Sequence, residues 1–389
     1  MKQRQGYIIT MLCASLLLTL CGCSDDSSDG MQQRMQELRL SLGYPAYRTT
    51  NGITRTDPVL PASFELYSHS SSLQPISQIQ CYLTYEQEVE SQMQQKYISC
   101  QFDSATIGSP SAHVWTSKVP LYTLPNNSKY RLYGFMPKEN LFVQEDNNGA
   151  TIAPYGGNFT NGAVITFTGL NAVIAKDLCV IVGAQGYTGT EVPNMSSRLG
   201  KFDYYPESDG TNLFLLVDHI YAGLQFNMTL DVNYAALRDI KVKNILLKPE
   251  NAGNDVVEAV DAVVTIAANN TNQSPLSVAF PTDRYKKGKN PEPAVLYDGK
   301  AKSLSTDSPT FMACLCPGAN TKFTLETTYD VYDRKGNIIR EGETVRNAIS
   351  LDYDLEAGKL HTVNIKVMPT YLYVLSDPDL ESPTFVVVN

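Results

Sequence analysis

The chain has 389 residues and a formal net charge of −9 at pH 7, with a sequence pI of about 5.1. Proteins that bind nucleic acids need clustered lysine and arginine to contact phosphates, so this acidic balance argues against a nucleic-acid partner. Tyrosine is abundant, at 23 residues against 13 phenylalanines and 1 tryptophan, which favours pleated strands over helices. The length corresponds to about two ordinary domains once a leader is removed.

The N-terminus has the pattern of a secretory leader. A basic start is followed by the apolar run 7–20, which has the length of a signal-peptide core and is too short to span a bilayer as a stable helix. The run ends in Leu20-Cys21-Gly22-Cys23, which resembles a bacterial lipobox. The resemblance implies that residues 1–22 are a lipoprotein signal peptide and that Cys23 carries an acyl chain such as palmitate. Acylation at Cys21 and an ordinary cleaved signal peptide are the alternatives.

Residues 23–56 are expected to form an acidic tether and a pre-segment ahead of the first domain. The stretch 24–30 is rich in Asp and Ser and resembles the surface-export signal of Bacteroidota lipoproteins, which implies a surface-exposed location on the outer membrane. Apolar residues at helical spacing then predict a short amphipathic helix over 31–42, ended by Gly43. These apolar residues are Met31, Met35, Leu38 and Leu42.

From Ala62 onward, apolar and polar residues alternate, which is the period of a strand with one buried and one solvated face. Turn residues at 333–337 separate two such runs, as expected of a β-hairpin. Short strands separated by Gly, Pro and Asn turns predict an all-β chain of antiparallel β-sandwiches. The clearest alternating runs are 79–85, 224–232, 323–332 and 362–367.

The best candidate for a domain boundary is the polar stretch 205–212, which contains Pro206 and Gly210 and precedes an apolar strand. Two tandem sandwich domains are therefore predicted, an N-terminal one over 57–208 and a C-terminal one over 209–389. No internal repeat of fixed period is visible in either part of the sequence.

Beyond the leader and Cys23, the cysteines are odd in number, which leaves at least one thiol unpaired in an exported protein. Cys81 and Cys100 stand on two predicted strands joined by a polar loop, so either a cross-strand disulfide or two packed thiols fits them. Cys314 and Cys316 have the spacing of a metal or redox element. No cluster of further ligands accompanies them, so packing on one face of a strand is the better interpretation. No metal site and no cofactor are expected.

The sequence carries no catalytic motif, and we expect no enzyme activity. A nucleophile elbow, a zinc-binding H-E-x-x-H helix and a P-loop are all absent from it. The histidines are dispersed, and none has a neighbour at metal-ligand spacing. His219, beside Asp218 at the end of an apolar run, is the one that a functional interpretation would choose. The better interpretation of His219 is a histidine at the end of a strand whose hydrogen bond is satisfied.

The C-terminus is unusually apolar. Residues 370–375 form a strong strand pattern, 376–383 interrupt it with polar residues and prolines, and 384–389 finish the chain as another strand. The last residues of a domain are usually polar and frayed. An apolar, β-branched terminal run must therefore pair within its own domain or complete the sheet of a neighbour.

Several segments taken together resemble the fimbrillins, the type V pilins of Bacteroidota and their accessory subunits. Besides the lipobox and the arginine-containing pre-segment, these segments are 130–137, 218–220 leading into an alternating strand, 234–240 and 369–374. The resemblance covers most of the chain and implies two transthyretin-like antiparallel β-sandwich domains. It also implies a structural subunit that assembles into a fimbria on the cell surface and supports adhesion.

The resemblance further implies assembly by strand exchange. In that family an arginine-specific protease cuts the pre-segment, the first strand leaves an apolar groove, and a strand of a neighbouring subunit fills the groove. Arg55 and Arg48 are then the candidate cleavage sites, with Arg55 preferred. The partners would be other fimbrial subunits, in a homo- or heteropolymer, and a host or bacterial surface ligand. The candidate donor is the segment 370–389, with Tyr371, Tyr373, Phe385, Val386, Val387 and Val388 as its apolar residues.

Two alternatives stay open on the sequence. A fimbrial anchor subunit would keep its lipid and would never be cut. A surface glycan-binding lipoprotein would also be a lipidated β-sandwich. The glycan-binding alternative has little support, because tyrosines spread over strands more often serve packing and a single tryptophan offers little for a sugar-binding platform.

Overall fold

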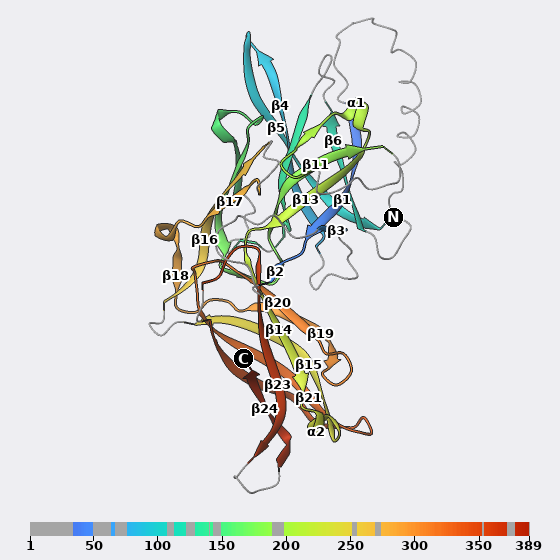
Figure 1. Ribbon diagram of the computed structural model, residues 1–389, viewed down its shortest axis with the longest axis vertical. Coiled ribbons are helices and arrows are strands. Elements are labelled where there is room, and N and C mark those ends of the chain that lie inside the picture. Colours follow the sequence, from blue (N-terminus) through green and yellow to red (C-terminus); the bar gives the residue numbers. More distant parts are fainter. Residues whose placement is uncertain are drawn as a thin grey trace, which may run out of the picture.

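Strands make up nearly all of the regular structure, which confirms the predicted all-β class. Figure 1 shows an elongated molecule, with strands of the N-terminal half at one end and strands of the C-terminal half at the other. Helices are short: α1 (Pro206–Asp209), α2 (Val232–Ala235) and 3-10 turns at 155–157 and 282–284. The computed structural model describes residues 34–49, 64–66, 76–106, 113–121, 129–139, 141–142, 149–188, 198–250, 255–268, 274–351, 354–371 and 378–388.

The first sheet has 9 strands and closes on itself. Its strands are β1 (Arg34–Pro45), β3 (Phe64–Leu66), β4 (Gln78–Val89), β5 (Gln92–Thr106), β6 (His113–Leu121), β7 (Tyr130–Met136), β11 (Cys179–Tyr187), β12 (Asp203–Tyr204) and β13 (Asn212–His219). The order is β11-β13-β1-β6-β5-β4-β7, and β7 pairs in turn with β11. This ring differs from the open two-layer arrangement expected for the N-terminal domain, because both edges of β7 are paired.

A second sheet lies between the two ends of the molecule. It has 5 strands in the order β17-β16-β9-β8, with β18 paired to β16. Its buried residues, such as Ile165 and Val264, belong to the same core as those of the first sheet. The strands are β8 (Ala150–Pro154), β9 (Gly162–Asn171), β16 (Val256–Ala267), β17 (Leu276–Ala279) and β18 (Lys286–Gly288).

The C-terminal unit consists of two sheets around a second core. One follows the order β10-β20-β14-β23, and both β2 and β24 pair with β23; the other follows the order β19-β15-β21-β22. We call the first of these the β23 sheet. The predicted hairpin turn at 333–337 joins β21 to β22, and Asp333 Oδ1 accepts from the amides of Lys335 and Asn337 at 2.8 Å each. The strands are β2 (Arg48–Thr49), β10 (Val173–Ile174), β14 (Ala222–Leu230), β15 (Arg238–Glu250), β19 (Ala294–Ser303), β20 (Thr310–Leu315), β21 (Lys322–Asp333), β22 (Ile338–Ser350), β23 (Lys359–Tyr371) and β24 (Pro378–Val388).

The predicted domain boundary at 208/209 falls just ahead of β13. That strand pairs with β11 and β1, and β16 pairs with β9, so segments on both sides of the boundary share the first two sheets. The chain therefore crosses between the two units more than once. Sequence composition marks turns, but it does not reveal which sheet a later strand joins.

The helix predicted over 31–42 is wrong in its described part, which is the strand β1. Leu38, Leu40 and Leu42 are all buried, and the residues between them face away from the core. These leucines fit the period of a strand, whereas the helical pattern depended on methionines nearer the leader. Pairing with two neighbouring strands decides the outcome, because tertiary contacts override a short and ambiguous periodicity.

Because β1 contributes its leucines to the core, Leu40→Ala should lower the free energy of unfolding by about 2–5 kcal/mol. Arg39→Ala, on the exposed face of the same strand, should change it by less than about 0.5 kcal/mol. Trp115 is fully buried and stands opposite Leu40 on β6, so its fluorescence in a urea titration reports the transition. Equal losses in the two variants would mean that β1 does not contribute its apolar face to the core.

Candidate functional site

The strand β1 lies inside the first sheet, with partners along both edges (Figure 1). It runs parallel to β13, where Arg39 to Gly43 pair with Asn212 to Leu216. On its other edge it runs antiparallel to β6 over residues 34–40 and to β3 over residues 43–45. The backbone of β1 therefore takes part in two ladders of hydrogen bonds, one along each edge.

The inner face of β1 is apolar and its outer face is charged. Leu38 and Leu40 are fully buried, and Leu42 is 1 % exposed. Each buried leucine stabilises the fold by about 1.5–3 kcal/mol relative to an exposed one. On the opposite face, Glu37 and Arg39 are exposed and form an ion pair of 3.5 Å. Without β1 the facing edges of β13 and β6 would lose their partners, and the core behind the leucines would meet water.

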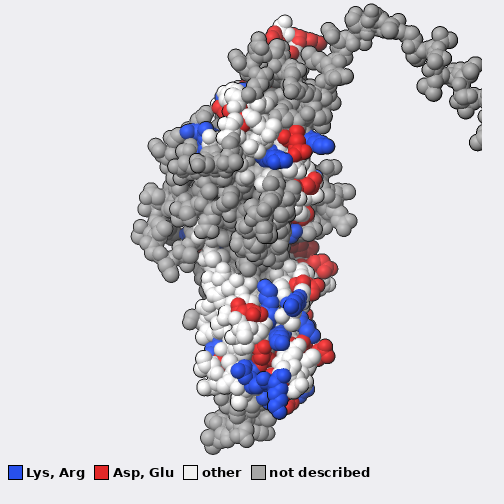
Figure 2. All heavy atoms as spheres, turned by 90° about the vertical axis from the view of Figure 1, so that its right-hand side faces the viewer, with Lys and Arg blue, Asp and Glu red and all other residues white. Residues whose placement is uncertain are grey.

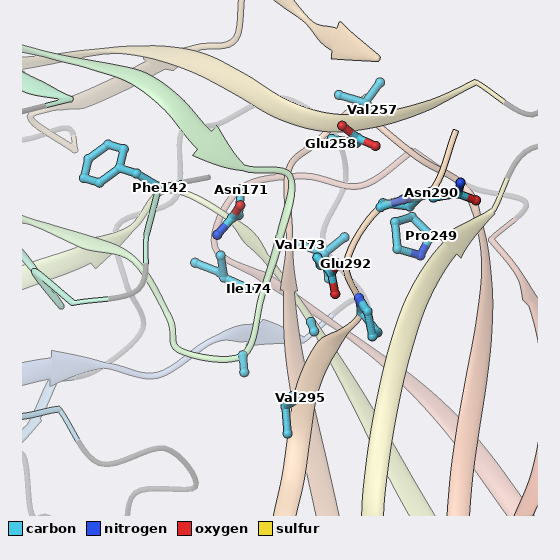
Figure 3. A pocket seen from close by; sticks show the side chains of 14 residues that line it. Phe142, Asn171, Val173, Ile174, Pro249, Val257, Glu258, Asn290, Glu292 and Val295 are labelled. Atoms are coloured by element: carbon cyan, nitrogen blue, oxygen red, sulfur yellow. The ribbon is translucent and has the colours of Figure 1, made fainter. Parts of the chain in front are cut away.

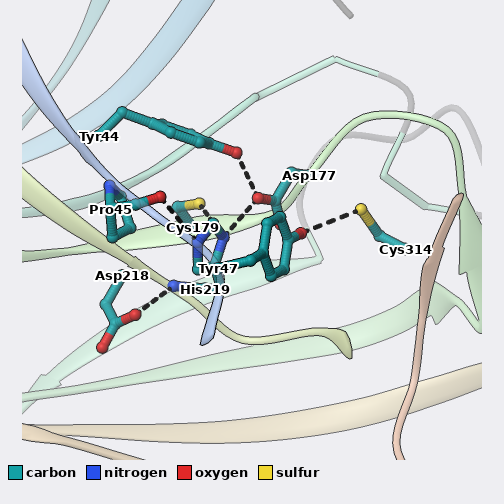
Figure 4. Close-up of polar contacts among 8 residues, drawn as sticks. All are labelled: Tyr44, Pro45, Tyr47, Asp177, Cys179, Asp218, His219 and Cys314. Atoms are coloured by element: carbon teal, nitrogen blue, oxygen red, sulfur yellow. Dashed lines mark hydrogen bonds and ion pairs between the residues drawn. The ribbon is translucent and has the colours of Figure 1, made fainter. Parts of the chain in front are cut away.

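A buried polar cluster anchors the end of β1, as Figure 4 shows. His219 Nδ1 lies 2.5 Å from Asp177 Oδ2, and His219 Nε2 lies 3.1 Å from the carbonyl oxygen of Pro45. The side chains of this pair are 1% and 3% exposed. A carbonyl and a carboxylate can only accept hydrogen bonds, so both ring nitrogens donate and His219 is an imidazolium ion. The pre-segment is thus held through its backbone by a buried ion pair.

The pKa shifts of this pair agree with the geometry. Burial alone would lower the pKa of His219, but the charge and hydrogen bond of Asp177, together with the charge of Asp218 and the Pro45 carbonyl, raise the pKa overall. Burial alone would likewise raise the pKa of Asp177, but the charge of His219 and the hydrogen bonds of His219 and Tyr44 lower it. Each partner therefore keeps the other charged. Asp218, next in sequence, instead accepts from the backbone amide of His219 at 2.8 Å.

Two tyrosines of the pre-segment complete the cluster. The hydroxyl of Tyr44 donates to Asp177 Oδ2. The ring of Tyr47 stacks on the His219 ring, with centroids 3.8 Å apart and planes 15° apart. The hydroxyl of Tyr47 lies 3.5 Å from Cys314 Sγ on β20, so this residue links the pre-segment to the C-terminal unit.

Among the described residues, Asp177, Cys179 and His219 are the one group whose ligand atoms lie close enough to hold a metal ion, all within 4.8 Å. They do not fit one well, because the His219 and Asp177 atoms that face each other are already bonded. Burial also raises the pKa of the Cys179 thiol, which keeps it protonated, whereas a metal needs a thiolate. The arrangement is explained without a metal ion.

A cavity of about 470 Å³ lies elsewhere, beside the start of β19 (Figure 3). Glu258 and Glu292 contribute carboxylates to its wall, and Phe142, Val173 and Val295 contribute apolar surface. No histidine, cysteine or serine is among the residues that line it. The cavity lining therefore offers no thiol, serine hydroxyl or imidazole, and it shares no residue with β1 or the polar cluster.

Basic residues on the C-terminal unit are intermixed with acidic ones on the face that Figure 2 shows. Lys243 Nζ lies 2.7 Å from Asp330 Oδ2, and Lys366 Nζ lies 2.8 Å from Asp231 Oδ2. These pairs leave less free positive charge for a polyanion, in keeping with the acidic composition. In the part of the chain that the structure describes, no helix is long and apolar enough to cross a membrane.

The C-terminal donor candidate pairs within its own unit. β24 runs antiparallel to β23, from Asn364 opposite Val388 to Tyr371 opposite Pro378. Phe385 is 4% exposed and packs on Tyr329, whereas Val386 and Val388 are 36% and 43% exposed. β23 is its only ladder partner among the described strands, so β24 lies at the edge of the β23 sheet.

The other predicted site residues are spread apart. Cys23, Arg55 and Tyr373 lie outside the described residues. The backbone of Arg48 lies in β2 and pairs with Lys359 at the start of β23. The structure thus brings Arg48 and the donor candidate to the same strand, β23, but it does not bring β24 to β1.

The remaining cysteines are buried free thiols among the described residues. Cys81 and Cys100 stand directly opposite each other on β4 and β5, and burial raises the pKa of Cys100 to about 12. Cys314 and Cys316 are buried, and Cys314 meets Tyr47, so packing rather than metal binding describes them.

Sequence reasoning missed β1 itself, Asp177 and the two tyrosines of the pre-segment. The alternation of Leu38, Leu40 and Leu42 was the available signal for the strand. The interpretation of His219 as a strand-end histidine with a satisfied hydrogen bond agrees with the structure, and its carboxylate partner is Asp177, 42 positions away, rather than the adjacent Asp218. Nothing in the local sequence indicates a contact over that separation.

No family model and no curated protein matches the chain. Solved structures are similar over most of its length. A candidate cell adhesion protein of Bacteroides fragilis is 10% identical with a TM-score of 0.42, and the match covers 91% of this chain and 97% of that one. The tip fimbrial protein Mfa3 of Porphyromonas gingivalis, C-terminally truncated, is 10% identical with a TM-score of 0.24, over 90% and 99% of the two chains. The fimbrial anchor protein Mfa2 of the same organism is 10% identical with a TM-score of 0.22, over 90% and 95%.

The polar cluster should make stability depend on pH in a defined direction. Because the pKa of His219 is raised above its ordinary 6.5, its contribution is complete below that pH and is lost as pH rises through the raised value. Because the pKa of Asp177 is lowered below 3.8, its contribution is complete above that pH and is lost as pH falls through the lowered value. The ionisable groups facing the pair are Tyr44, Tyr47, Cys179, Asp218 and Cys314, and burial raises the pKa of both tyrosines and both thiols.

Thermal unfolding of the uncut protein should therefore show a loss of stability on the alkaline side of pH 6.5 that His219→Gln abolishes. Removing one partner of a buried ion pair typically costs about 3–5 kcal/mol, so the variant should also be less stable near pH 6. His361→Gln is the matched control: burial lowers the pKa of His361, so it does not produce an alkaline loss. If the loss of stability at alkaline pH persists in His219→Gln, deprotonation of His219 is not its cause, and the account of the ion pair is wrong.

Proposed function

We propose that the protein is a structural subunit of a bacterial surface fimbria that supports adhesion. In this proposal it reaches the surface of the outer membrane as a lipoprotein acylated on Cys23 and assembles after a protease removes its pre-segment. The observation that carries the proposal is β1. It is paired along both edges and buries an apolar face, yet it lies so close to the N-terminus that one cut beyond it separates it from the rest of the fold.

The cut is the step that creates a binding site. Loss of β1 leaves β13 and β6 with unpaired backbone groups and uncovers the core under Leu38, Leu40 and Leu42. Burying three such leucines stabilises by about 5–9 kcal/mol before the cost of ordering the strand. A strand of similar pattern from a neighbouring subunit regains the same ladders and the same burial.

Arg55 is the better of the two cleavage candidates. A protease binds its substrate as an extended strand and needs a backbone free of other partners. The backbone of Arg48 pairs with Lys359 in the β23 sheet, so cleavage there requires β2 to detach first. A cut after Arg55 removes β1, both tyrosines of the cluster and β2 together.

The donor in this proposal is the C-terminal segment, which includes β24. An edge strand can leave a sheet without breaking a second ladder. Leaving exposes Phe385, which a neighbour's groove would bury again, whereas Val386 and Val388 are already partly exposed. Exchange therefore replaces one buried arrangement with another rather than creating burial from nothing.

The anchor subunit is the nearest alternative, because the uncut fold with β1 in place is what an anchor would keep. The glycan-binding alternative loses support from Trp115, the one tryptophan of the chain, which is fully buried. Among the described residues, the exposed tyrosines Tyr97 and Tyr155 lie on different elements, β5 and the 3-10 turn at 155–157.

Assembly can be tested with two variants that each perform half of the exchange. A protein cut after Arg55 and lacking residues 378–389 can accept a strand but not donate one. An uncut Arg48→Gln, Arg55→Gln protein with its C-terminus can donate but not accept. On SDS gels run without boiling, each variant alone should stay monomeric. The mixture should yield a dimer and no larger oligomers.

Cut protein with an intact C-terminus should form a ladder in the same assay. Thermal melts of the truncated variant before cutting show whether it is folded, since Phe385 belongs to the C-terminal core. A cut, intact protein that remains monomeric while releasing β1 would contradict the proposal. Recovery of the natural surface protein with an acylated Cys23 as its N-terminus, and with no N-terminus after Arg48 or Arg55, would favour the anchor role instead.

A further inference from the structure

The ring of Tyr47 occupies a close-fitting site at the junction of the two units. One face of the ring lies on His219, at 3.8 Å between centroids. Its hydroxyl reaches Cys314 Sγ at 3.5 Å. A Cβ atom added to Gly223 on β14 would lie 2.9 Å from both Leu360 Cδ1 and Tyr47 Cε1 and 3.0 Å from Tyr47 Cζ, so a side chain at position 223 would crowd the ring.

Gly223 is otherwise an unexpected residue for its position. It lies within β14, where glycine weakens a strand because it has no side chain to pack and loses more entropy than other residues. It does not adopt a positive φ, so its backbone conformation does not require glycine. The space that the Tyr47 ring and the Leu360 side chain take up accounts for a glycine at this position.

The residues around the ring come from separate parts of the fold. His219 ends β13 of the first sheet, Gly223 and Cys314 belong to the β23 sheet, and Asp177 precedes β11. Figure 4 shows Tyr47 between His219 on one side and Cys314 on the other. All of them remain when the pre-segment is cut away, whereas Tyr47 leaves with it. We call His219, Gly223, Cys314 and Asp177 the aromatic socket.

We propose that the aromatic socket is a binding site for one aromatic side chain of a β-strand, and that it determines which strands can occupy the place of β1. This inference rests on the proposed strand exchange. Tyr47 fills the socket before cleavage, and a strand of a neighbouring subunit binds tightly there only when it also brings an aromatic ring. The cationic ring of His219 favours the face of an aromatic group over an aliphatic chain of equal size.

The spacing in the pre-segment defines the rest of the ligand. Leu38, Leu40 and Leu42 enter the core at every second position, and Tyr47 follows Leu42 after a stretch that contains Pro45. The carbonyl of Pro45 accepts from His219, so the backbone is fixed just before the ring. A strand shifted by two residues would keep its apolar face inward but would miss the socket, so the socket also selects register.

The test uses the full chain with a site-specific protease sequence inserted between residues 55 and 56, folded first and cut afterwards. Fluorescent peptides with the sequence of residues 34–49 then compete for the place of the cut strand, and their affinities are measured by polarisation. Tyr47→Ala and Tyr47→Leu peptides should bind about 30-fold more weakly, as for an aromatic hot spot. A Tyr47→Phe peptide should lose only about threefold, because it keeps the ring.

A Glu37→Gln peptide is the matched control, since Glu37 lies on the exposed face of β1, and it should bind within about twofold of the natural sequence. In the protein, Gly223→Ala should weaken binding of the natural peptide more than binding of the Tyr47→Ala peptide, because the added methyl group would crowd the Tyr47 ring as well as Leu360. The peptide variants leave the protein unaltered, so their comparison does not depend on folding of a mutant.

Two negative results have different meanings in this experiment. If the natural and Tyr47→Ala peptides bind equally well, the socket proposal is wrong while strand exchange stands. If no peptide, including the natural one, enters the cut protein although β1 has left, the proposed function fails as well.

Discussion

The structure depends on the two-sided pairing of β1. A strand in the interior of a sheet satisfies the backbone of both neighbours, so its removal leaves two rows of unpaired groups and an open core, whereas loss of an edge strand leaves one row. β1 supplies this pairing from the first described residues of the chain, with Leu38, Leu40 and Leu42 as its contribution to the core. A sheet built in this way is complete only while a strand of that pattern is present, whichever chain provides it.

The buried ion pair of Asp177 and His219 gives this strand a defined end. Burying two charges is costly, and a hydrophobic pair of similar volume often serves stability as well. The ion pair instead fixes the position of the strand along its neighbours. His219 donates to one backbone carbonyl, that of Pro45, and its ring stacks on one side chain, that of Tyr47. A uniformly apolar groove would accept a strand in several registers, and a polar contact at one end removes that freedom.

The sequence revealed the fold class better than the site. Alternation over β14, β21 and β23, and the turn at Asp333, were sufficient for the all-β prediction and for one hairpin. The helix predicted over 31–42 failed because Met31 and Met35 supplied half of the helical pattern, whereas Leu38, Leu40 and Leu42 follow the period of a strand that pairs with β13 and β6. His219 could be selected from its place at the end of an apolar run. Asp177 and Tyr47 could not, because their contacts with it span 42 and 172 positions and arise from topology alone.

The central claim is that another strand can replace β1, and hydrogen exchange at β13 tests it most directly. The amides of residues 212–216 that face β1 should be protected in the uncut protein, lose protection when β1 is removed, and regain it in the assembled polymer. Amides of β13 that face β11 serve as the internal reference and should stay protected throughout. Protection that survives the removal of β1, or that never returns on assembly, would contradict the account.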